Sequence, residues 1–465
     1  MQTIAITYLF PYCFCMSNCK TQRIRDPIHG LIVFRKDNTV DQLAWQLIDT
    51  PEFQRLRRIK QLGVSEFVYP GATHTRFTHS IGVFHTARKL AKIIKREVGE
   101  GFNQEKADIS IIAALLHDIG HGPFSHTFER VQRQRGIAKN HEQWSAEIIT
   151  SPEGKIKPLL DGYPLHDLAN AISDILTRDV PSDIYSAIVS SSFDADRLDY
   201  LRRDRYMTGT KAGAIDFDWL VDNLRVRKIK LDADEGGDDN PPMVETFCFE
   251  HKAKAAAEQF LLARYSLHQQ VYFHKTTRCV ERMIAELLFL VSQKPSRWNT
   301  KLAANHPLLL FFSKNGDTLD HYLALDDAVI LGALRQLQYA NDEKIRSLAK
   351  RILNRDLYKT FDLESASESD GRRKRMWDKI EKLRKSGAFS GVVWHDFAAT
   401  VNIYSTISDY EERAHKKLRI AYQNGKSKEI TSVSKLIETV ERDKKPLIRY
   451  YFENESDRQL ALKGR

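Results

Sequence analysis

Cysteine is scarce in this chain and irregularly placed. Only five occur in 465 residues: Cys13, Cys15 and Cys19 crowd the N-terminus, while Cys248 and Cys279 stand alone. An odd count without regular spacing argues against a disulfide framework and favours a reducing compartment. The N-terminal run has no fourth partner at zinc-site spacing, so a structural zinc site there is not favoured.

Long apolar runs are absent as well. The stretch Thr3–Met16 is fairly apolar, but it is too short to span a bilayer and has no positively charged n-region. We therefore expect a cytoplasmic protein without membrane association. Met16 is an alternative start of translation, because the polar residues from Ser17 onward lead directly into the first recognisable motif.

Negative charge is in the minority. The chain has 71 Lys and Arg against 61 Asp and Glu, which gives a formal net charge of +10. This balance favours a polyanionic partner, such as a nucleotide phosphate, and also leaves room for weak binding of nucleic acid. With 42% hydrophobic and 28% charged residues the chain can bury a large core.

Apolar residues recur at helical spacing along most of the chain. The pattern predicts a helix over 76–98 with His79 on its apolar face, and another that begins near Asp108 and carries His117 and Asp118 at its end. Short β-rich pieces occur at 30–34 and 224–231. We expect a mainly α fold: a helical core with small β elements and a smaller α+β C-terminal lobe. The predicted divisions are an N-terminal extension (1–22), a core (23–360), a polar linker (361–390) and a C-terminal lobe (391–465).

The segment 115–126 carries the densest chemical signal. His117 and Asp118 follow an apolar helical run, and His121 and His126 come within the next few residues. Buried imidazole and carboxylate groups each need a partner, and a divalent metal provides one. A single histidine on an apolar face is more often a core residue, but this clustering favours a functional site.

Two further ligands must come from elsewhere. His79 lies beside Arg76 on an apolar helix face, and Asp196 would share a helix face with Tyr200 and Asp204. Taken alone, the second pattern is also compatible with a solvated charged helix.

These residues carry a resemblance to the HD superfamily of metal phosphohydrolases. Within it, the chain resembles the deoxynucleoside triphosphate (dNTP) triphosphohydrolases related to the sterile-alpha-motif and HD-domain protein, over about residues 23–359. The resemblance implies that four side chains bind a divalent metal (Fe, Mn, Mg or Zn), with an additional Mg on the triphosphate. The matching motifs are Arg25–Gly30, Asp49–Arg57, Ile59–Leu62, Val68–Ala72, Arg76–Ser80, His117–His126 and Tyr265–Lys275, and the implied ligands are His79, His117, Asp118 and Asp196.

The family also implies roles in catalysis and substrate binding. His126 matches the histidine beside the scissile phosphoester, and His121 matches a residue that contacts the phosphates. His141 and Glu142 match a histidine–glutamate pair that supports His126. Such a site would hydrolyse a dNTP to the deoxynucleoside and triphosphate, with His126 donating a proton to the leaving oxygen. The implied pocket consists of Gln61 and Asp204 (sugar 3′-hydroxyl), Tyr200 (2′ position), Leu62 (base), and Arg76, Arg264, Tyr272 and Lys275 (phosphates and base).

Members of this family assemble with nucleotides bound between subunits. Asp49, Gln54 and Arg57 match residues that read a guanine there, as in dGTP, and Arg225 matches another allosteric contact. We therefore expect a homo-oligomer, a dimer or a tetramer. Arg25 stands where the family pattern has an uncharged polar residue, so the identity of the activator stays open.

Two other functions use the same residues. An HD-type nuclease or phosphodiesterase would suit the positive charge, but Gln61, Tyr200 and Asp204 make sense only in a pocket for a deoxyribose monomer. A module that binds nucleotides without cleaving them would not need the full ligand set or His126.

Overall fold

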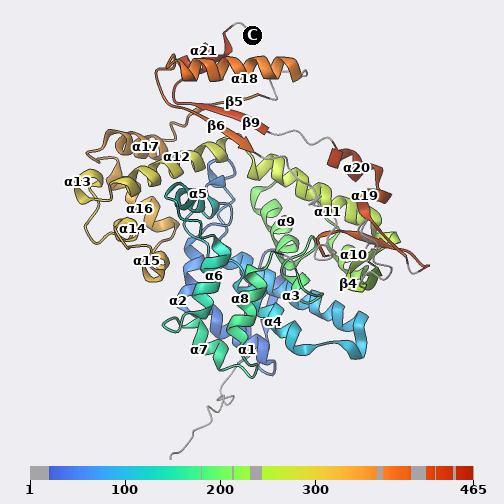
Figure 1. Cartoon of the computed structure of the whole chain (residues 1–465). Coiled ribbons are helices and arrows are strands. Elements are labelled where there is room, and N and C mark those ends of the chain that lie inside the picture. Colours follow the sequence, from blue (N-terminus) through green and yellow to red (C-terminus); the bar gives the residue numbers. More distant parts are fainter. Residues whose placement is uncertain are drawn as a thin grey trace, which may run out of the picture.

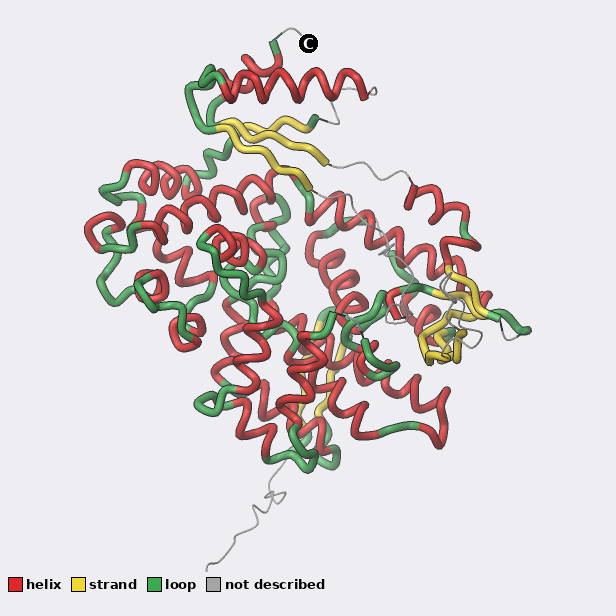
Figure 2. The backbone as a smooth tube through the Cα atoms, in the orientation of Figure 1, coloured by secondary structure: helices red, strands yellow, loops and turns green. Residues whose placement is uncertain are grey.

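Helices make up most of the protein, and strands are confined to three small sheets (Figures 1 and 2). The structure is a computed structural model, which describes residues 20–179, 181–211, 214–230, 243–363, 370–398, 415–424, 426–442 and 447–463. The predicted mainly α class is confirmed. The N-terminal cysteines Cys13, Cys15 and Cys19 and the alternative start Met16 lie outside the described residues.

The N-terminal half of the chain forms a helical unit that opens with an antiparallel hairpin. A 3-10 turn (Arg55–Arg58) extends the short α2, and Ile59 then resumes an extended conformation. The elements are β1 (Gln22–Asp26), β2 (Gly30–Phe34), α1 (Thr39–Ile48), α2 (Pro51–Gln54), α3 (Arg76–Val98), α4 (Gln104–Leu116), α5 (His126–Gln134), α6 (His141–Thr150), α7 (Ile156–Asp161), α8 (Leu168–Thr177), α9 (Ala195–Thr208) and α10 (Phe217–Asp222).

Helix α3 is the central element of this unit and has the predicted bounds. It packs against both α4 and α9. Its buried side includes Val83, Leu90 and Ile94, which recur at helical spacing and so form one apolar face. Because His79 lies on the same face, the packing that holds α3 in place also buries this histidine completely.

A second helical unit follows and has its own core. Met283, Leu287 and Leu334 are among its buried residues, and Phe128 of α5 joins them. Trp144 of α6 stacks on Tyr322, with ring centroids 3.9 Å apart, so this core is continuous with the first unit. Helix α11 (Lys254–Leu267) and a π turn (His268–Tyr272) lead into this unit but bury their apolar residues in the first core. The elements of the second unit are α12 (Lys275–Gln293), α13 (Arg297–Thr300), α14 (Pro307–Phe312), α15 (Leu319–Leu323), α16 (Asp327–Leu337) and α17 (Glu343–Leu353).

The described residues after α17 contribute to two sheets, one of which also contains the earlier strands β3 and β4, and to four helices. One sheet has the order β5-β9-β6, and α18 and α21 cover the face that points away from the helical body (Figure 1). The other has the order β3-β4-β7-β8, in which β7 runs parallel to β4. The elements are β3 (Leu224–Lys230), β4 (Met243–Glu250), β5 (Lys359–Asp362), α18 (Asp370–Lys385), β6 (Val393–Ala398), β7 (Arg419–Ala421), β8 (Ser427–Glu429), α19 (Ile430–Val433), α20 (Lys435–Arg442), β9 (Leu447–Phe452) and α21 (Glu455–Leu462).

This arrangement differs from the predicted linker and lobe. The stretch 361–390, expected to be a polar linker, contains α18, whose Ile380 is buried among Phe361, Tyr450 and Phe452. The polar composition of this stretch predicted a linker. A single apolar stripe, however, is enough to pack a mostly polar helix against a sheet. Part of the expected C-terminal lobe, β7 and β8, instead extends the sheet of β3 and β4.

Among the described residues, no helix is both long enough and apolar enough to cross a membrane.

Close packing at Gly120 holds the 115–126 segment against α6. A Cβ at this position would collide with the backbone carbonyl of His141 and the backbone nitrogen of Ser145. We expect Gly120→Ala to destabilise the protein by about 1–3 kcal/mol, because backbone atoms must move to relieve the overlap. Gly332→Ala is the matched control: its position in α16 is open, so helix propensity should stabilise the protein by up to about 1 kcal/mol. Thermal unfolding of both variants measures the difference, and equal melting temperatures would contradict this packing.

Candidate functional site

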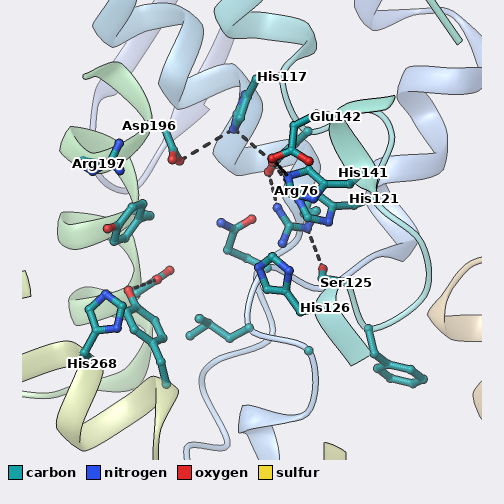
Figure 3. Close-up of a pocket in the computed structure, with 18 of the residues that line it drawn as sticks. Arg76, His117, His121, Ser125, His126, His141, Glu142, Asp196, Arg197 and His268 are labelled. Atoms are coloured by element: carbon teal, nitrogen blue, oxygen red, sulfur yellow. Dashed lines mark hydrogen bonds and ion pairs between the residues drawn. The ribbon is translucent and has the colours of Figure 1, made fainter. Parts of the chain in front are cut away.

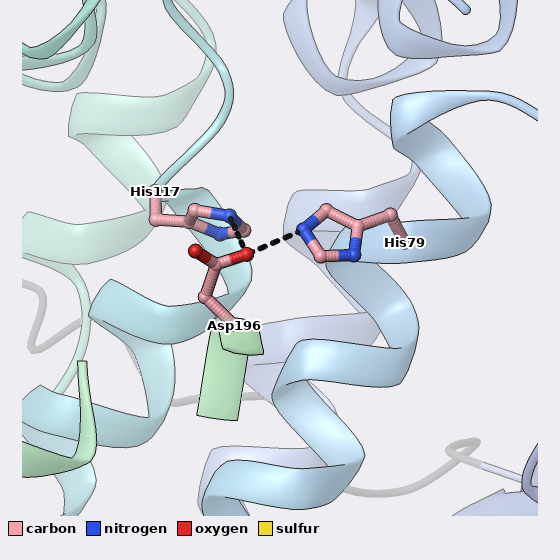
Figure 4. A group of neighbouring side chains, drawn as sticks. All are labelled: His79, His117 and Asp196. Carbon is pink, nitrogen blue, oxygen red and sulfur yellow. Dashed lines mark hydrogen bonds and ion pairs between the residues drawn. The ribbon is translucent and has the colours of Figure 1, made fainter. Parts of the chain in front are cut away.

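Three helices bring the predicted metal ligands together. His79 comes from α3, Asp196 from the first turn of α9, and His117 and Asp118 from the end of α4. One oxygen of Asp196, Oδ1, lies 2.9 Å from Nε2 of His79 and 3.8 Å from Nε2 of His117 (Figure 4). Nε2 of His117 is also 3.2 Å from Oδ1 of Asp118. The four groups therefore converge, and their role as metal ligands stays a prediction.

Hydrogen bonds on the far side of each imidazole fix its orientation. Nδ1 of His117 donates to the carbonyl of Ala114 at 2.9 Å, and Nδ1 of His79 donates to Oδ2 of Asp199 at 2.8 Å. Since the carbonyl and the carboxylate can only accept, both rings carry a proton on Nδ1 and direct Nε2 at the site. This is how metal-binding histidines are commonly oriented.

Asp199 is itself held by a buried network that the sequence analysis missed. Its carboxylate accepts from Nε2 of His29 at 2.6 Å and from Nε and Nη2 of Arg203 at 2.7 and 2.9 Å. Arg203 also donates to Asp26 at 2.7 Å. Gly82 faces this network from α3, where a Cβ would overlap the Asp199 carboxylate and the Arg203 guanidinium. Small size at residue 82 is thus a condition for the contact between α3 and α9.

The charge balance of the site suits a cation. Burial lowers the pKa of His79, but the carboxylates of Asp196, Asp199 and Asp118 outweigh it and raise the pKa to about 10. Burial would raise the pKa of Asp118, yet Arg76 and the neighbouring histidines hold it well below its usual range. Nε2 of His117 is buried and has no hydrogen-bond partner. His79, His117 and Asp196 lie close enough to share one ion, and Oδ2 of Asp118 is 3.7 Å from Nε2 of His79, so the donor set fits a divalent metal ion.

A strained turn places the next functional groups. Phe124 and Ser125 both have φ of +52°, a conformation that non-glycine residues rarely adopt. The backbone N–H of Phe124 donates to Asp327 at 2.7 Å, and Oγ of Ser125 accepts from Nε of Arg76 at 2.8 Å. Nη1 of Arg76 also donates to the Asp118 carboxylate. The turn therefore starts α5 at His126 and fixes Arg76 beside the metal ligands.

A group of three histidines lies across the cavity from Asp196 (Figure 3). The rings of His121 and His141 stack with centroids 3.9 Å apart, whereas the side chain of His126 is 72% exposed and faces the cavity. Glu129 connects the group: its carboxylate is 2.6 Å from Nδ1 of His141 and 3.4 Å from Nδ1 of His126. The carboxylate between His126 and His141 is thus that of Glu129, whereas Glu142 contacts only His141 of the two, at 3.3 Å.

One cavity of about 530 Å³ lies between these groups, a size that suits a small-molecule ligand, and His117, Asp118 and Asp196 line it whereas the fully buried His79 does not. Gln61, Leu62, Tyr200, Asp204 and Tyr272 line it together with Arg76 and the histidines, in agreement with their predicted proximity. Tyr272 donates to Oδ2 of Asp204 at 2.7 Å, and Nε2 of His74 lies 2.8 Å from Oδ1.

Two of the predicted substrate contacts do not line the cavity. Lys275 is exposed at the start of α12, and Arg264 lies half-buried on α11, where its charge acts on Tyr200.

The predicted nucleotide-reading residues lie outside the cavity. Oε1 of Gln54 accepts from Nε of Arg57 at 2.7 Å, and the Arg57 guanidinium lies over the Phe77 ring at 3.5 Å. Asp49 ends α1 close by in the chain and is exposed. Arg225 belongs to β3 and pairs with Glu250 at 2.7 Å. A role between subunits for these four residues stays a prediction.

Comparison with known proteins gives matches along most of the chain. A model described as HD domain matches residues 76–201, and one described as HD associated region matches residues 244–450. An uncharacterized protein of Bacillus subtilis, YwfO, is 28% identical over 422 residues, which are 90% of this chain and 88% of that protein. The crystal structure of a phosphohydrolase from Bacteroides thetaiotaomicron is similar with a TM-score of 0.70 and 27% identity, covering 93% of this chain and 100% of that one.

Two further relatives have names that state an activity. The deoxynucleoside triphosphate triphosphohydrolase SAMHD1 homolog of Dictyostelium discoideum is 33% identical over 356 residues, which are 73% of this chain but only 60% of that protein. Deoxynucleoside triphosphate triphosphohydrolase SAMHD1 of Danio rerio is 27% identical over 481 residues, covering 94% of this chain and 71% of that protein.

The contact between Asp199 and His79 predicts a measurable effect on metal affinity. Asp199→Asn removes the charge that orients and polarises His79, so we expect the affinity for Mn²⁺ to fall about 10–100-fold. Asp218→Asn, at an exposed position of α10, is the matched control and should bind metal like the unmodified protein. Competition with a chromogenic chelator measures both affinities. An unchanged affinity in a folded Asp199→Asn protein would show that Asp199 has no such role.

Proposed function

This chain belongs to the HD-domain phosphohydrolase family, as its motifs predicted, and we propose that it hydrolyses dNTPs to a deoxynucleoside and triphosphate. The observation that carries the proposal is the content of one cavity. It combines a divalent-metal donor set, an exposed histidine, and a wall of Gln61, Tyr200 and Asp204 that suits a deoxyribose.

The metal would be held by His79, His117, Asp118 and Asp196. A divalent ion there supplies Lewis-acid polarisation of a phosphoryl oxygen and lowers the pKa of water. Fe, Mn, Mg and Zn are all compatible with two imidazoles and two carboxylates.

His126 is the proposed proton donor. Its Nδ1 lies near the Glu129 carboxylate, which leaves Nε2 on the exposed side of the ring to protonate the 5′-oxygen as the bond to phosphorus breaks. Glu129 stabilises the protonated imidazole and is shared with His141, so the two histidines are oriented together. Arg76 and the neighbouring His121 would orient the phosphate, since a guanidinium fits phosphate oxygens in a fixed geometry.

The opposite wall would select the sugar. Asp204 is fixed by Tyr272 and His74, so its carboxylate is placed to accept from a 3′-hydroxyl, together with Gln61. The Tyr200 ring, 6.2 Å from that of Tyr272, would crowd a 2′-hydroxyl and disfavour ribonucleotides. Leu62 supplies an apolar contact for the base.

The names of the Dictyostelium and Danio relatives support this substrate class. The proposal extends to a homo-oligomer, a dimer or tetramer, in which Asp49, Gln54, Arg57 and Arg225 bind an activating nucleotide such as dGTP. It also places the protein in the cytoplasm.

Product analysis tests the activity directly. The purified protein is incubated with each dNTP alone and with all four together, in the presence of Mn²⁺ or Mg²⁺, and the products are separated by anion-exchange chromatography. We expect deoxynucleosides and triphosphate in equal amounts, and slower cleavage of the ribonucleotides. No product under any condition would refute the proposal, whereas cleavage of single-stranded DNA or cyclic dinucleotides alone would favour the nuclease or phosphodiesterase alternative.

Variants separate the metal ligands from the proton donor. His117→Ala should lose both bound metal and activity. His126→Ala should keep its metal and lose about 10²–10⁴-fold in kcat, because proton transfer to a leaving group contributes about this much. His166→Ala, an exposed histidine outside the cavity, is the control. Metal content by atomic emission and turnover by chromatography give the two readouts, and loss of metal from His126→Ala would contradict the assigned role.

A further inference from the structure

A segment from the far end of the chain contributes to the wall of the active-site cavity. The backbone N–H of Ser192 donates to the carbonyl of His415 at 3.1 Å, and Oγ of Ser192 donates to the carbonyl of Lys416. These bonds dock the segment 415–418 beside the loop that precedes α9. Lys416 thereby lines the same cavity as Ser190 and Arg197, more than 200 residues earlier in the sequence.

The ammonium group of Lys416 lacks a carboxylate partner. Its Nζ donates to Oγ of Ser190 at 3.1 Å, and among the described residues no carboxylate lies within ion-pair distance of it. Burial and then the charge of Arg197 lower its pKa. The carboxylates of Asp194 and of the exposed Asp179 act on it in the opposite sense, but neither forms an ion pair with it, so a positive charge remains directed at the cavity.

The neighbouring charges do not remove this excess. Asp194 is the buried carboxylate of this wall, and it already forms an ion pair with Nη1 of Arg197 and caps α9 by accepting from the backbone N–H of residue 197. Arg264 adds a further positive charge that acts on Lys416 from α11. Burying an uncompensated charge is costly, and an anionic ligand offsets this cost.

We infer that Lys416 binds the distal phosphates of the substrate; this inference rests on the proposed function. Arg197 directly follows the metal ligand Asp196, and Figure 3 shows both on the side opposite Arg76 and the histidine group. With the α-phosphate between the metal ligands and His126, the rest of the triphosphate must lie on a cationic surface. Arg197 and Lys416 form that surface next to Asp196, and lysine is a common point-charge partner of phosphate.

With this assignment, both the HD domain and the HD associated region contribute phosphate-binding residues to the cavity. The HD domain supplies the metal ligands and Arg197, whereas Lys416 lies within the HD associated region. Binding of a triphosphate would thus also stabilise the docking of the 415–418 segment on Ser192.

The test compares two adjacent lysines. Lys416→Gln removes the proposed contact, whereas Lys417→Gln is the matched control, because Lys417 pairs with Glu429 at 3.5 Å and does not line the cavity. The probe is inorganic tripolyphosphate, with its dissociation constant measured by calorimetry on the metal-loaded full-length protein. We expect about tenfold weaker binding for Lys416→Gln, unchanged binding for Lys417→Gln, and wild-type-like binding for Lys416→Arg.

Kinetics and a shorter ligand complete the test. The KM for a dNTP should rise about tenfold in Lys416→Gln while kcat changes less than about threefold, since the contact is made equally in the ground and transition states. Affinity for a deoxynucleoside monophosphate should stay the same, because it lacks distal phosphates. Wild-type-like tripolyphosphate binding by Lys416→Gln would overturn the inference, as would equal weakening of monophosphate binding. If the unmodified protein cleaves no dNTP but loses tripolyphosphate binding on Lys416→Gln, the proposed function fails and the phosphate contact stands.

Discussion

The imidazole of His79 lies between two carboxylates, and the geometry of the whole site depends on this interaction. Asp196 and Asp199 both come from α9, three residues apart, so one helix face contacts both ring nitrogens of a histidine on α3. Neither contact survives a change in the distance between the helices. The absence of a side chain at Gly82, the bidentate bond from Arg203 to Asp199 and the apolar packing of α3 all serve to keep that distance.

The same logic explains why so much charge is buried where it would otherwise be costly. Asp118, Asp199 and Arg203 are almost completely inaccessible, yet each has an oppositely charged partner with good geometry. Buried ionic groups contribute little net stability when paired, and leaving one unpaired is strongly destabilising. These ion pairs therefore fix the geometry of the site mainly because any other arrangement would leave a buried charge unpaired. Their net contribution to the free energy of folding is small.

Local sequence signals were sufficient for part of this molecule. Helix α3 was predictable because its apolar residues repeat at helical spacing, and the HD cluster because three histidines and an aspartate crowd ten residues. Glu129 was within reach of the same reasoning, since it lies one helical turn from His126. Asp199 was not distinguishable from other charged residues of α9 without knowing which face meets α3. The docking of 415–418 and the sheet that joins β4 to β7 depend on contacts between residues far apart in sequence, for which one sequence has no periodic signature.

The second helical unit acts on the site through the strained turn at Phe124 and Ser125. Such a backbone conformation persists only where its surroundings hold it. Here Asp327 of α16 accepts from the N–H of Phe124, and Tyr322 donates to the carbonyl of Gly120 at 2.6 Å. Burial raises the pKa of Asp327 to about 6 although the N–H groups of Lys60 and Phe124 favour its charged form. Burial disfavours the charged form of Asp327, but its carboxylate fixes two backbone N–H groups. One belongs to Lys60, next to the cavity residue Gln61, and the other to Phe124, shortly before His126. The site therefore depends on both helical units. The first supplies the proposed metal ligands, and the second fixes the turn from which the proposed proton donor projects.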